Sequence, residues 1–493
     1  MCTAQRAPAI VLGVGIVLLA LTFGVGWIGF PKILEKKIAE RVQLKNGTQT
    51  WEKWSNVSTP IFMKFHIFNT TNPDEVAAGK KPKLEELGPY VYEEKRVKVD
   101  IELNEENNTV LYRQPVHYFF RPDLSNGTEE DEIVTLNIPL VVLTTVAAQK
   151  GWLAQMVIGG VLAEHEEEEL FMKLSVGQLL FKGKYVPMMK TLEDTSGEPS
   201  ALKNHTFGLF YPKNGSDEGV LEVKTGVDDP MQFGNVVSWN GKTELEFWKS
   251  KYCNMINGTD GSLFPPFVTR DRIVRLFSAD LCRSLYLTYT QDIEFNGIKG
   301  YRFAVPKEEL EDSRTNDENT CFCTEPGLNK AGCLKSGAIQ LSACRRGAPI
   351  VMSTPHFLDG SEEYINGVEG LKPDREKHLT YVDLEPNTGL MLTVHKRIQV
   401  NIDLKTNTVS DHFSNVPEII YPILWADEGA GMAVDTQEAV KGVILKTIGI
   451  VDIGKWALLG LSCTLVAAGV ILLLICKRSN RGGYSAARTS EKQ

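Results

Sequence analysis

Residues Ala7 to Phe30 read APAIVLGVGIVLLALTFGVGWIGF, and residues Trp456 to Cys476 read WALLGLSCTLVAAGVILLLIC. Neither segment contains a charged side chain. A helix rises about 1.5 Å per residue, so the first segment is about 35 Å long and is able to cross a hydrocarbon core of about 30 Å. The sequence therefore predicts transmembrane helices at residues 7–30 and 456–476, with most of the chain between them.

A cleaved signal peptide is the alternative for the first segment. Its apolar stretch is longer than the roughly 7–15 residues of a signal-peptide core, and no small-residue cleavage site follows it. Trp27, Phe30 and Pro31 instead suit an anchor at the membrane interface. We therefore expect a span that stays in the mature protein.

The flanking residues indicate the orientation of the chain. A basic cluster that begins at Lys477 follows the second span and places the C-terminal tail in the cytosol. Eight Asn-x-Ser/Thr sequons lie between the spans, which indicates exposure to the lumen or the cell exterior. We expect a glycosylated domain at 31–455 and cytosolic tails at 1–6 and 477–493. The predicted glycosylation sites are Asn46, Asn56, Asn69, Asn107, Asn126, Asn204, Asn214 and Asn257.

Six of the nine cysteines fall within the 92 residues from Cys253 to Cys344, on the side that carries the sequons. An even number of cysteines in an oxidising compartment predicts three disulfide bonds, and six cysteines allow fifteen pairings. Zinc binding is the alternative. The Cys321-Phe322-Cys323 spacing differs from that of zinc sites, and the next histidine is His356, so we expect no metal.

The two tails bear on lipidation and localisation. Cys2 and Cys476 lie at the cytosolic ends of the predicted spans, where reversible palmitoylation is expected, with free thiols as the equal alternative. The C-terminal tail contains no di-leucine signal, and no bulky apolar residue follows Tyr484 at the spacing of a tyrosine sorting signal. We therefore expect the plasma membrane, with lysosomal or endosomal membranes as the alternative.

Short apolar or alternating segments separated by Gly, Pro, Asn and Asp turns fill most of the central domain. This pattern is typical of β-strands, and many short strands at such spacing predict a mainly β fold, an antiparallel barrel or sandwich with helical additions. We expect a single β-rich unit. The predicted strands are 61–68, 90–99, 110–118, 300–305, 350–353, 390–394 and 397–404.

Residues 146–190 are the exception to the β pattern. Gly151–Ala163 is apolar except for Gln155, and it is too short to cross a bilayer. An acidic run, Glu164–Glu169, follows it. A helix that is apolar on all sides is ordinarily buried, and the alternative is a helical cap whose apolar surface meets a lipid or a partner.

Short motifs follow one another along nearly the whole chain. This ordered series resembles the class B scavenger receptor family, which includes a fatty-acid translocase, the high-density lipoprotein receptor and a lysosomal integral membrane protein. The motifs are FNTTNP from Phe68, GPYVY from Gly88, TLNIP from Thr135, GLFY from Gly208, WNGK from Trp239, CNMINGT from Cys253, CRS from Cys282, CFCTE from Cys321 and PHF from Pro355.

The resemblance implies a barrel-like β domain with a helical crown at 146–190 and a hydrophobic tunnel that leads to the membrane. It also implies the disulfide pairing, which is Cys253 with Cys321, Cys282 with Cys344 and Cys323 with Cys333. A Cys321–Cys323 bond, as in one relative, stays open as an alternative. The implied function is a cell-surface receptor that docks lipoproteins or free lipids and passes apolar cargo to the membrane.

The partners implied are lipoprotein particles and lipids, namely fatty acids, sterols, phospholipids and, as a further candidate, carotenoids. No cofactor is implied, and association between copies of the chain stays open. We expect the crown to provide the docking surface, with the acidic run setting charge selectivity and His165 making docking pH-dependent. The expected docking residues are Trp152, Met156, Ile158, Val161, Leu162, Glu164, His165, Glu166, Glu167, Glu168, Glu169, Leu170 and Phe171.

In this family the crown often presents lysines to anionic ligands, whereas five of the six residues Glu164–Glu169 are glutamates. The sign of the charge is inverted, so binding of oxidised lipoproteins is not expected here, and a solvated surface without a ligand is the alternative. Two other receptor functions stay open: a lysosomal sorting receptor for a soluble hydrolase, and a phagocytic or sensory co-receptor for hydrophobic ligands.

Other function classes are disfavoured by the sequence. The net charge of −9 and the pI near 5.6 argue against nucleic-acid binding. The chain contains no G-x-S-x-G, H-E-x-x-H or P-loop motif, and its eight histidines are scattered without ligand spacing. We therefore expect a protein that is not an enzyme.

Overall fold

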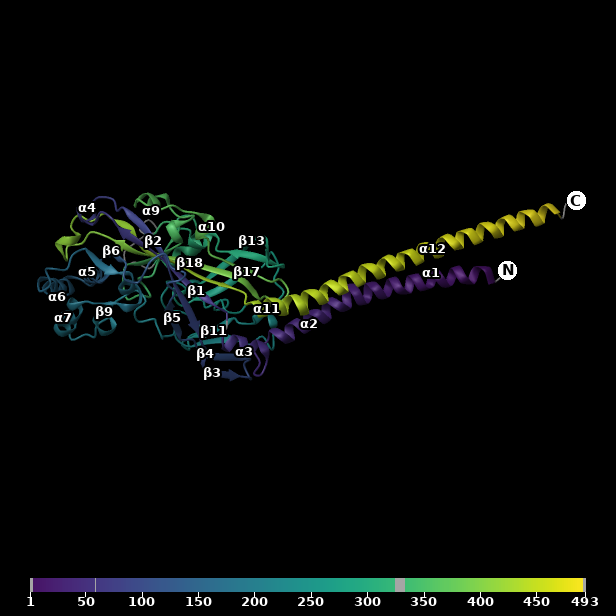
Figure 1. Cartoon of the computed structure of the whole chain (residues 1–493), viewed down its shortest axis with the longest axis horizontal. Helices are drawn as coiled ribbons and strands as arrows, with labels where there is room; N and C mark the ends of the chain where they lie inside the picture. Colours follow the sequence, from purple (N-terminus) through teal and green to yellow (C-terminus); the bar gives the residue numbers. More distant parts are fainter. Residues whose placement is uncertain (1–2, 58, 324–332, 491–493) are drawn as a thin grey trace. The chain divides into compact units, whose positions relative to one another are not determined.

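The computed structural model describes residues 3–57, 59–323 and 333–490 (Figure 1). The chain divides into two compact units. Val42–Ala433 form one unit, and the two terminal segments, which end at Arg41 and begin at Val434, form the other.

The terminal unit consists of helices from both ends of the chain. Two helical stretches, Arg6–Val42 and Val434–Arg478, are long and apolar enough to cross a membrane by length and composition. A Cβ atom at Gly15 would lie 2.8 Å from the backbone of Val466, so the two helices approach closely through small residues. The elements are α1 Thr3–Leu21, η1 Thr22–Gly29 and α2 Phe30–Val42, then α11 Val434–Ala439, η10 Val440–Leu445 and α12 Lys446–Ser490.

An antiparallel sheet of eleven strands organises the central unit. Its main order is β12-β13-β14-β17-β18-β19-β1-β2-β5, and β16 pairs with β18 and β15 with β16. The described strands β12 and β5 stand at the two ends of this order and do not pair with each other. The bounds are β1 Ile61–Thr70, β2 Leu84–Arg96, β5 Val116–Phe120, β12 Val274–Ser278, β13 Arg283–Phe295, β14 Ile298–Ala304, β15 Ala338–Gln340, β16 Ile350–Ser353, β17 Tyr381–Leu384, β18 Met391–Leu404 and β19 Ile419–Gly431.

The mainly β prediction is confirmed, with three differences in strand limits. The predicted strand 90–99 covers the end of β2, Leu84–Arg96, and the first residue of β3, which lies in another sheet. The predicted strand 110–118 is two strands in different sheets, because Pro115 has no N–H for a ladder. The predicted strands 390–394 and 397–404 are one continuous strand, β18. The smaller sheets contain β3 Val99–Asn104, β4 Thr109–Arg113, β10 Leu221–Lys224 and β11 Val236–Trp239, then β6 Glu132–Leu136 with β7 Phe171–Ser175, and β8 Lys184–Tyr185 with β9 Thr206–Phe207.

One face of the large sheet, here called the inner face, changes from apolar to charged along the strands. Opposite residues on neighbouring strands point to the same side. The row through Ile67, Leu424 and Val400 is apolar, whereas the row through Glu428 and Lys396 is charged. The apolar rows belong to the main hydrophobic core.

Three longer helices carry the predicted helical region, and the segment 146–190 is not helical throughout. Gly151 adopts a positive φ of 92° and separates α5 from α6. Strand β7 follows α6 where a helical crown was predicted, because Phe171–Ser175 pairs with β6. The helices are α5 Ile138–Lys150, α6 Trp152–Ala163 and α7 Pro187–Ser196, with α3 Gln49–Ser55, α4 Pro73–Ala77, α8 Lys251–Asn254, α9 Glu362–Asn366 and α10 Arg375–His378 elsewhere, and short π or 3-10 turns η2 Gln178–Lys182, η3 Lys203–His205, η4 Pro230–Gln232, η5 Lys307–Leu310, η6 Asp317–Phe322, η8 Pro355–Phe357 and η9 Asp411–Phe413.

Candidate functional site

Helix α6 presents an apolar face to the outside of the central unit. Trp152, Leu153 and Met156 are 71%, 61% and 63% exposed, although each is a large apolar side chain. They are spaced so that one side of the helix carries them. This set, here called the apolar face of α6, is a candidate docking surface because exposed apolar clusters mark interaction sites.

Three of the predicted docking residues are not exposed in the structure. Ile158, Val161 and Leu170 are buried, because the helical period turns the first two toward the core and Leu170 lies directly before β7. Leu162 and Phe171 are half-buried, and the Phe171 ring lies 6.2 Å from that of Tyr421. Leu153 was missed, although it lies in the same apolar run.

The acidic run lies in turns after α6 and not on a helix face. Glu164, Glu166, Glu167 and Glu169 are exposed, whereas the Glu168 carboxylate accepts a 2.7 Å hydrogen bond from the Asn137 amide. This bond follows from the cap of α5, since the Asn137 side chain also accepts from the backbone N–H of Leu140. The run therefore combines exposed charge with one structural contact.

His165 is held beside α7. Its Nε2 atom lies 2.8 Å from the hydroxyl of Thr191, and its Nδ1 atom lies 3.4 Å from a carboxylate oxygen of Glu167. Only 13% of its side chain is exposed. A charge change at His165 would act on the contact between the turn after α6 and helix α7, and pH-dependent docking stays a prediction.

Three disulfide bonds form in the central unit, and their pairing is the one that the resemblance implies. Cys253 pairs with Cys321, Cys282 with Cys344 and Cys323 with Cys333. Among the lipidation candidates, Cys476 lies in α12 and Cys2 lies outside the described residues. Their palmitoylation stays a prediction.

Six of the eight predicted glycosylation asparagines are exposed, and Asn69 and Asn257 are half-buried. The Asn69 side-chain oxygen accepts a 2.9 Å hydrogen bond from the backbone N–H of Val134, which ties it to β6. Glycan attachment therefore meets the least obstruction at Asn46, Asn56, Asn107, Asn126, Asn204 and Asn214.

Histidines that are far apart in the sequence gather on the opposite face of the large sheet. His66 and His356 both contact the Glu86 carboxylate, at 2.8 and 2.9 Å, and the His66 ring stacks on Trp425 at 3.8 Å. Burial raises the pKa of Glu86, but the hydrogen bonds from His356 and His66 outweigh it and hold that pKa well below its usual range. Burial lowers the pKa of His378, which stacks on His356, to about 4. Within the described ranges no group of three or more His, Cys, Asp or Glu side chains is arranged to hold a metal ion.

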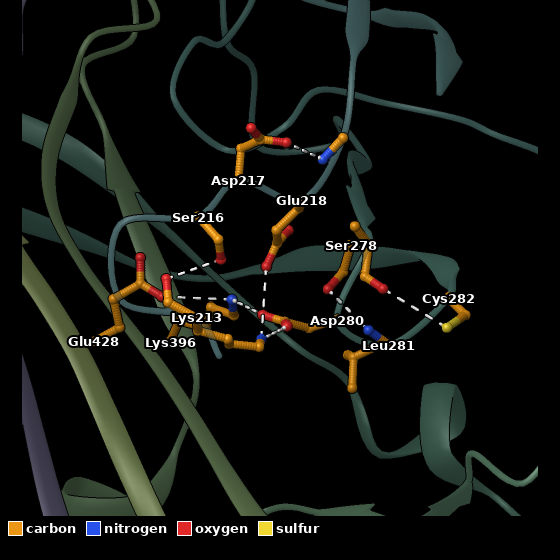
Figure 2. Close-up of polar contacts among 12 residues, drawn as sticks. Lys213, Ser216, Asp217, Glu218, Ser278, Asp280, Leu281, Cys282, Lys396 and Glu428 are labelled. Atoms are coloured by element: carbon orange, nitrogen blue, oxygen red, sulfur yellow. Dashed lines mark hydrogen bonds and ion pairs between the residues drawn. The ribbon is translucent and has the colours of Figure 1, made fainter. Parts of the chain in front are cut away.

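The inner face of the sheet carries a group of ionisable side chains that the sequence analysis did not predict. Two loops, around Lys213 and around Asp280, bring further charges over Lys396 and Glu428 of the central strands (Figure 2). Periodicity gives no signal for this, because the partners lie up to several hundred residues apart. The set, here called the interior charge cluster, consists of Glu94, Arg96, Lys213, Glu218, Asp280, Lys396 and Glu428.

The floor of the inner face is accessible although it lies inside the protein. Ile398, Val400 and Ala426 belong to central strands and are only half-buried. The Lys396 side chain is 38% exposed. Burial lowers its pKa, but the neighbouring carboxylates Glu428 and Asp280 outweigh this and raise it. The inner face therefore carries a half-buried apolar patch, Ile398, Val400 and Ala426, next to the partly exposed Lys396.

The chain is similar to several known membrane proteins along most of its length. A family model described as the CD36 family matches residues 13–473. Lysosome membrane protein 2 of Homo sapiens is 34% identical over 427 residues, which cover 86% of each chain. Sensory neuron membrane protein 2 of Heliothis virescens is 32% identical over 94% of this chain and 92% of its own, and sensory neuron membrane protein 1 of Apis mellifera is 32% identical over 87% and 84%.

Proposed function

This chain belongs to the CD36 family, the class B scavenger receptors, and on that premise we propose that it is a membrane receptor that takes up lipids from carriers and passes their apolar parts to the membrane. The observation that supports the proposal is the apolar patch of Ile398, Val400 and Ala426 on the inner face, which stays half-buried on central strands. Apolar surface inside a folded protein is normally close-packed, and an accessible apolar floor suits apolar cargo.

The physical advantage of such a conduit is the removal of water from the path of the cargo. Each CH₂ group exposed to water costs about 0.8 kcal/mol, so a long acyl chain or a sterol ester crosses water slowly. An apolar passage lowers that barrier without any chemistry. We propose accordingly that the function involves no catalysis, and that the large sheet with its covering loops acts as the barrel-like wall of the passage.

Placing a bulky side chain on this apolar patch tests the proposed function. Ala426→Phe places a ring on the floor between β18 and β1, and we expect it to reduce transfer of a neutral sterol ester into cells several-fold at unchanged surface expression. Leu390→Phe adds a similar ring at an exposed position and is the matched control. Normal transfer in Ala426→Phe, with the ring shown to occupy the floor, would exclude the conduit.

Docking is assigned to the apolar face of α6, as part of a helical crown formed by α5, α6 and α7. Trp152→Ala combined with Met156→Ala removes most of the exposed apolar area, and we expect loss of carrier binding with intact folding. Leu124, 47% exposed and outside the helices, provides the control Leu124→Ala. Equal carrier binding by the double variant and by Leu124→Ala would exclude the apolar face of α6 as the docking surface.

The relatives favour two further candidate functions. One similar protein is named a lysosome membrane protein and others are named sensory neuron membrane proteins, so a lysosomal receptor and a sensory co-receptor stand beside the plasma-membrane receptor that the tail favours. Localisation of the tagged full chain distinguishes the lysosomal receptor from the sensory co-receptor and the plasma-membrane receptor. Carrier binding measured between about pH 5 and pH 8, with His165→Ala beside wild type, tests the proposed docking role of His165.

A further inference from the structure

One of the eight predicted glycosylation sequons, Asn257-Gly258-Thr259, is held between two strands. It lies beside β11 on one side and β12 on the other. The backbone N–H of Val236 donates to the Gly258 carbonyl at 2.8 Å, and that of Phe277 donates to the Thr259 carbonyl at 2.8 Å. Glycosylated asparagines ordinarily lie in surface loops. The backbone of this sequon is fixed instead, so the position of the Asn257 side chain is fixed as well.

The middle residue of this sequon has to be glycine. Gly258 has a φ of 90°, and a Cβ atom there would lie 2.1 Å from the carbonyl oxygen of Arg275. The same tripeptide, Asn-Gly-Thr, begins at the exposed Asn46, where a Cβ atom on Gly47 would meet no described atom within 4 Å. Two sequons of identical sequence therefore have opposite surroundings, and Asn46 provides a matched control for Asn257.

A cavity of about 200 Å³ lies beside the fixed sequon, and both Asn257 and Thr259 line it. Sites for drug-sized ligands measure about 300–1,000 Å³, so this cavity suits a single small ring. Much of its remaining wall is apolar and includes Met231, Ile273 and Leu384. Met231 and Ile273 are 43% and 46% exposed, so the fold itself leaves apolar surface uncovered there.

Arg272 brings a cation to the same wall. Its Nη1 atom donates to the carbonyl oxygen of Pro266 at 2.9 Å and to that of Pro265 at 3.4 Å. No carboxylate of the described residues forms an ion pair with Arg272, and burial lowers its pKa. A guanidinium has five N–H donors, so those on Nε and Nη2 of Arg272 are left for oxygen atoms of water or of a ligand.

The fold does not use the Asn257 amide. Within the described part of the chain its side chain makes no hydrogen bond, and its backbone N–H donates to the Ser284 hydroxyl at 2.8 Å. At Asn69, the other half-buried sequon asparagine, the side-chain oxygen instead accepts from the backbone N–H of Val134. The Nδ2 atom of Asn257 is therefore available to carry a sugar at the wall of the cavity.

We propose that Asn257 is glycosylated and that the first N-acetylglucosamine of its glycan occupies this cavity. The sugar ring and the acetyl methyl group lie against the apolar wall, and the hydroxyl and acetamide oxygens accept hydrogen bonds from Arg272. Covering apolar surface and pairing these donors both stabilise the fold. The mainly apolar wall and the attachment at Asn257 favour this sugar over a small anion as the occupant.

The covalent step is ordinary N-glycosylation. The Asn257 Nδ2 atom forms a bond to C1 of the first sugar and loses one proton, while the bond from C1 to the diphosphate of the lipid-linked donor breaks and the diphosphate leaves with the electron pair. Transfer takes place on the growing chain before it folds, so the half-buried position of Asn257 in the folded domain does not prevent it. Folding then places the sugar in the cavity, where the link keeps its effective concentration high.

Deglycosylation of the folded full chain in nanodiscs tests the position of the sugar. The chain is produced with oligomannose glycans and treated with peptide-N-glycosidase F, which cleaves between asparagine and the first sugar and leaves aspartate. Peptide mass spectrometry measures conversion at Asn257 and at Asn46. We expect cleavage at Asn257 to be about tenfold slower, because the sugar must first leave the cavity. Arg272→Met is expected to speed cleavage at Asn257 several-fold and to leave the rate at Asn46 unchanged.

Thermal unfolding tests what the sugar contributes. Endoglycosidase H removes all but the first sugar from oligomannose glycans, and we expect the treated wild type to unfold at the same temperature as the untreated one. Asn257→Gln is expected to unfold about 2–4 °C lower, whereas the control Asn46→Gln is expected to match wild type. Arg272→Met is expected to lower the unfolding temperature more in the wild-type background than in Asn257→Gln, where its sugar partner is missing.

Several outcomes would overturn this assignment. They are an unmodified Asn257 in the untreated chain, equal cleavage rates at Asn257 and Asn46, and strictly additive effects of Arg272→Met and Asn257→Gln on the unfolding temperature. Inorganic phosphate is the probe for the competing occupant. A rise in the unfolding temperature of wild type with phosphate, abolished by Arg272→Met, would assign the cavity to a small anion instead. If Asn257→Gln does not fold, the cleavage rates in wild type and in Arg272→Met decide the question.

Discussion

The apolar face of α6 and the interior charge cluster reverse the usual distribution of side chains. Trp152, Leu153 and Met156 lie outside in water, whereas Lys396 and Glu428 lie inside on central strands. Most large apolar groups are buried and most charged groups are exposed in a stable domain. Both exceptions cost stability, and the exposed apolar side chains suit the docking surface proposed above.

The largest expected effect comes from removing the cation that satisfies two interior carboxylates. Arg96→Met leaves Glu94 and Glu428 without their closest partner, and we expect the free energy of unfolding to fall by about 3–5 kcal/mol. Urea unfolding of the full chain measures it. Arg121→Met, which removes contacts to Glu93 and Asp123 at the surface, is the control and should leave the midpoint unchanged. Similar urea midpoints for the two variants would show that the Arg96 contacts contribute no more to stability than the surface contacts of Arg121.

The two sides of α6 provide a second contrast, with a somewhat smaller effect. Ile158→Ala removes a buried side chain and is expected to cost about 2–4 kcal/mol of stability. Met156→Ala, two residues away and 63% exposed, is expected to stay within about 0.5 kcal/mol of wild type. Thermal unfolding measures both. A large loss in Met156→Ala would show that this face is packed and not available for docking.

The third and smallest expected effect is on the pH dependence of stability. The folded chain keeps the Glu94 proton up to about pH 7, whereas an unfolded glutamate loses it near its ordinary pKa of about 4.3. The folded state therefore binds more protons in this window, so stability is highest below it and falls as the pH rises. We expect Glu94 to contribute a fall of about 2–3 kcal/mol between about pH 4.5 and pH 7.5.

Glu94→Gln isolates that contribution. Unfolding of this variant is expected to depend less steeply on pH than that of wild type, measured by urea titration at several pH values. Glu93→Gln changes the neighbouring residue on the other face of β2 and is expected to keep the wild-type slope. A Glu94→Gln slope identical to wild type would show that Glu94 is already ionised at acidic pH.

Local pattern explains which parts of the fold could be anticipated. The strands β1, β14 and β16 begin at or near the predicted positions, because alternation and turn residues are local signals. The strand predicted at 110–118 is interrupted at Pro115. Phe171 was predicted to lie in a helical crown, but it pairs with Leu136 in a sheet. Pairing with a distant strand decides such cases, and periodicity does not report it.

The candidate site divides in the same way. The apolar run Trp152–Ala163 is visible in the sequence, but which of its side chains face water depends on where α5 and the core lie. The charge cluster has no sequence signal at all, because Arg96 and Glu428 are separated by 332 residues and meet only through the register of β1 with its two neighbours.

The sequence by itself determined the two apolar terminal segments, the sequons and clustered cysteines of the central domain, and its mainly β character, since hydropathy, sequons and strand patterns are properties of contiguous residues. Only the tertiary structure decided that one side of α6 is exposed, and that seven ionisable groups from distant segments gather on one face of the large sheet. Burial and charge pairing depend on which segments become neighbours in space, and that is a property of the folded chain as a whole.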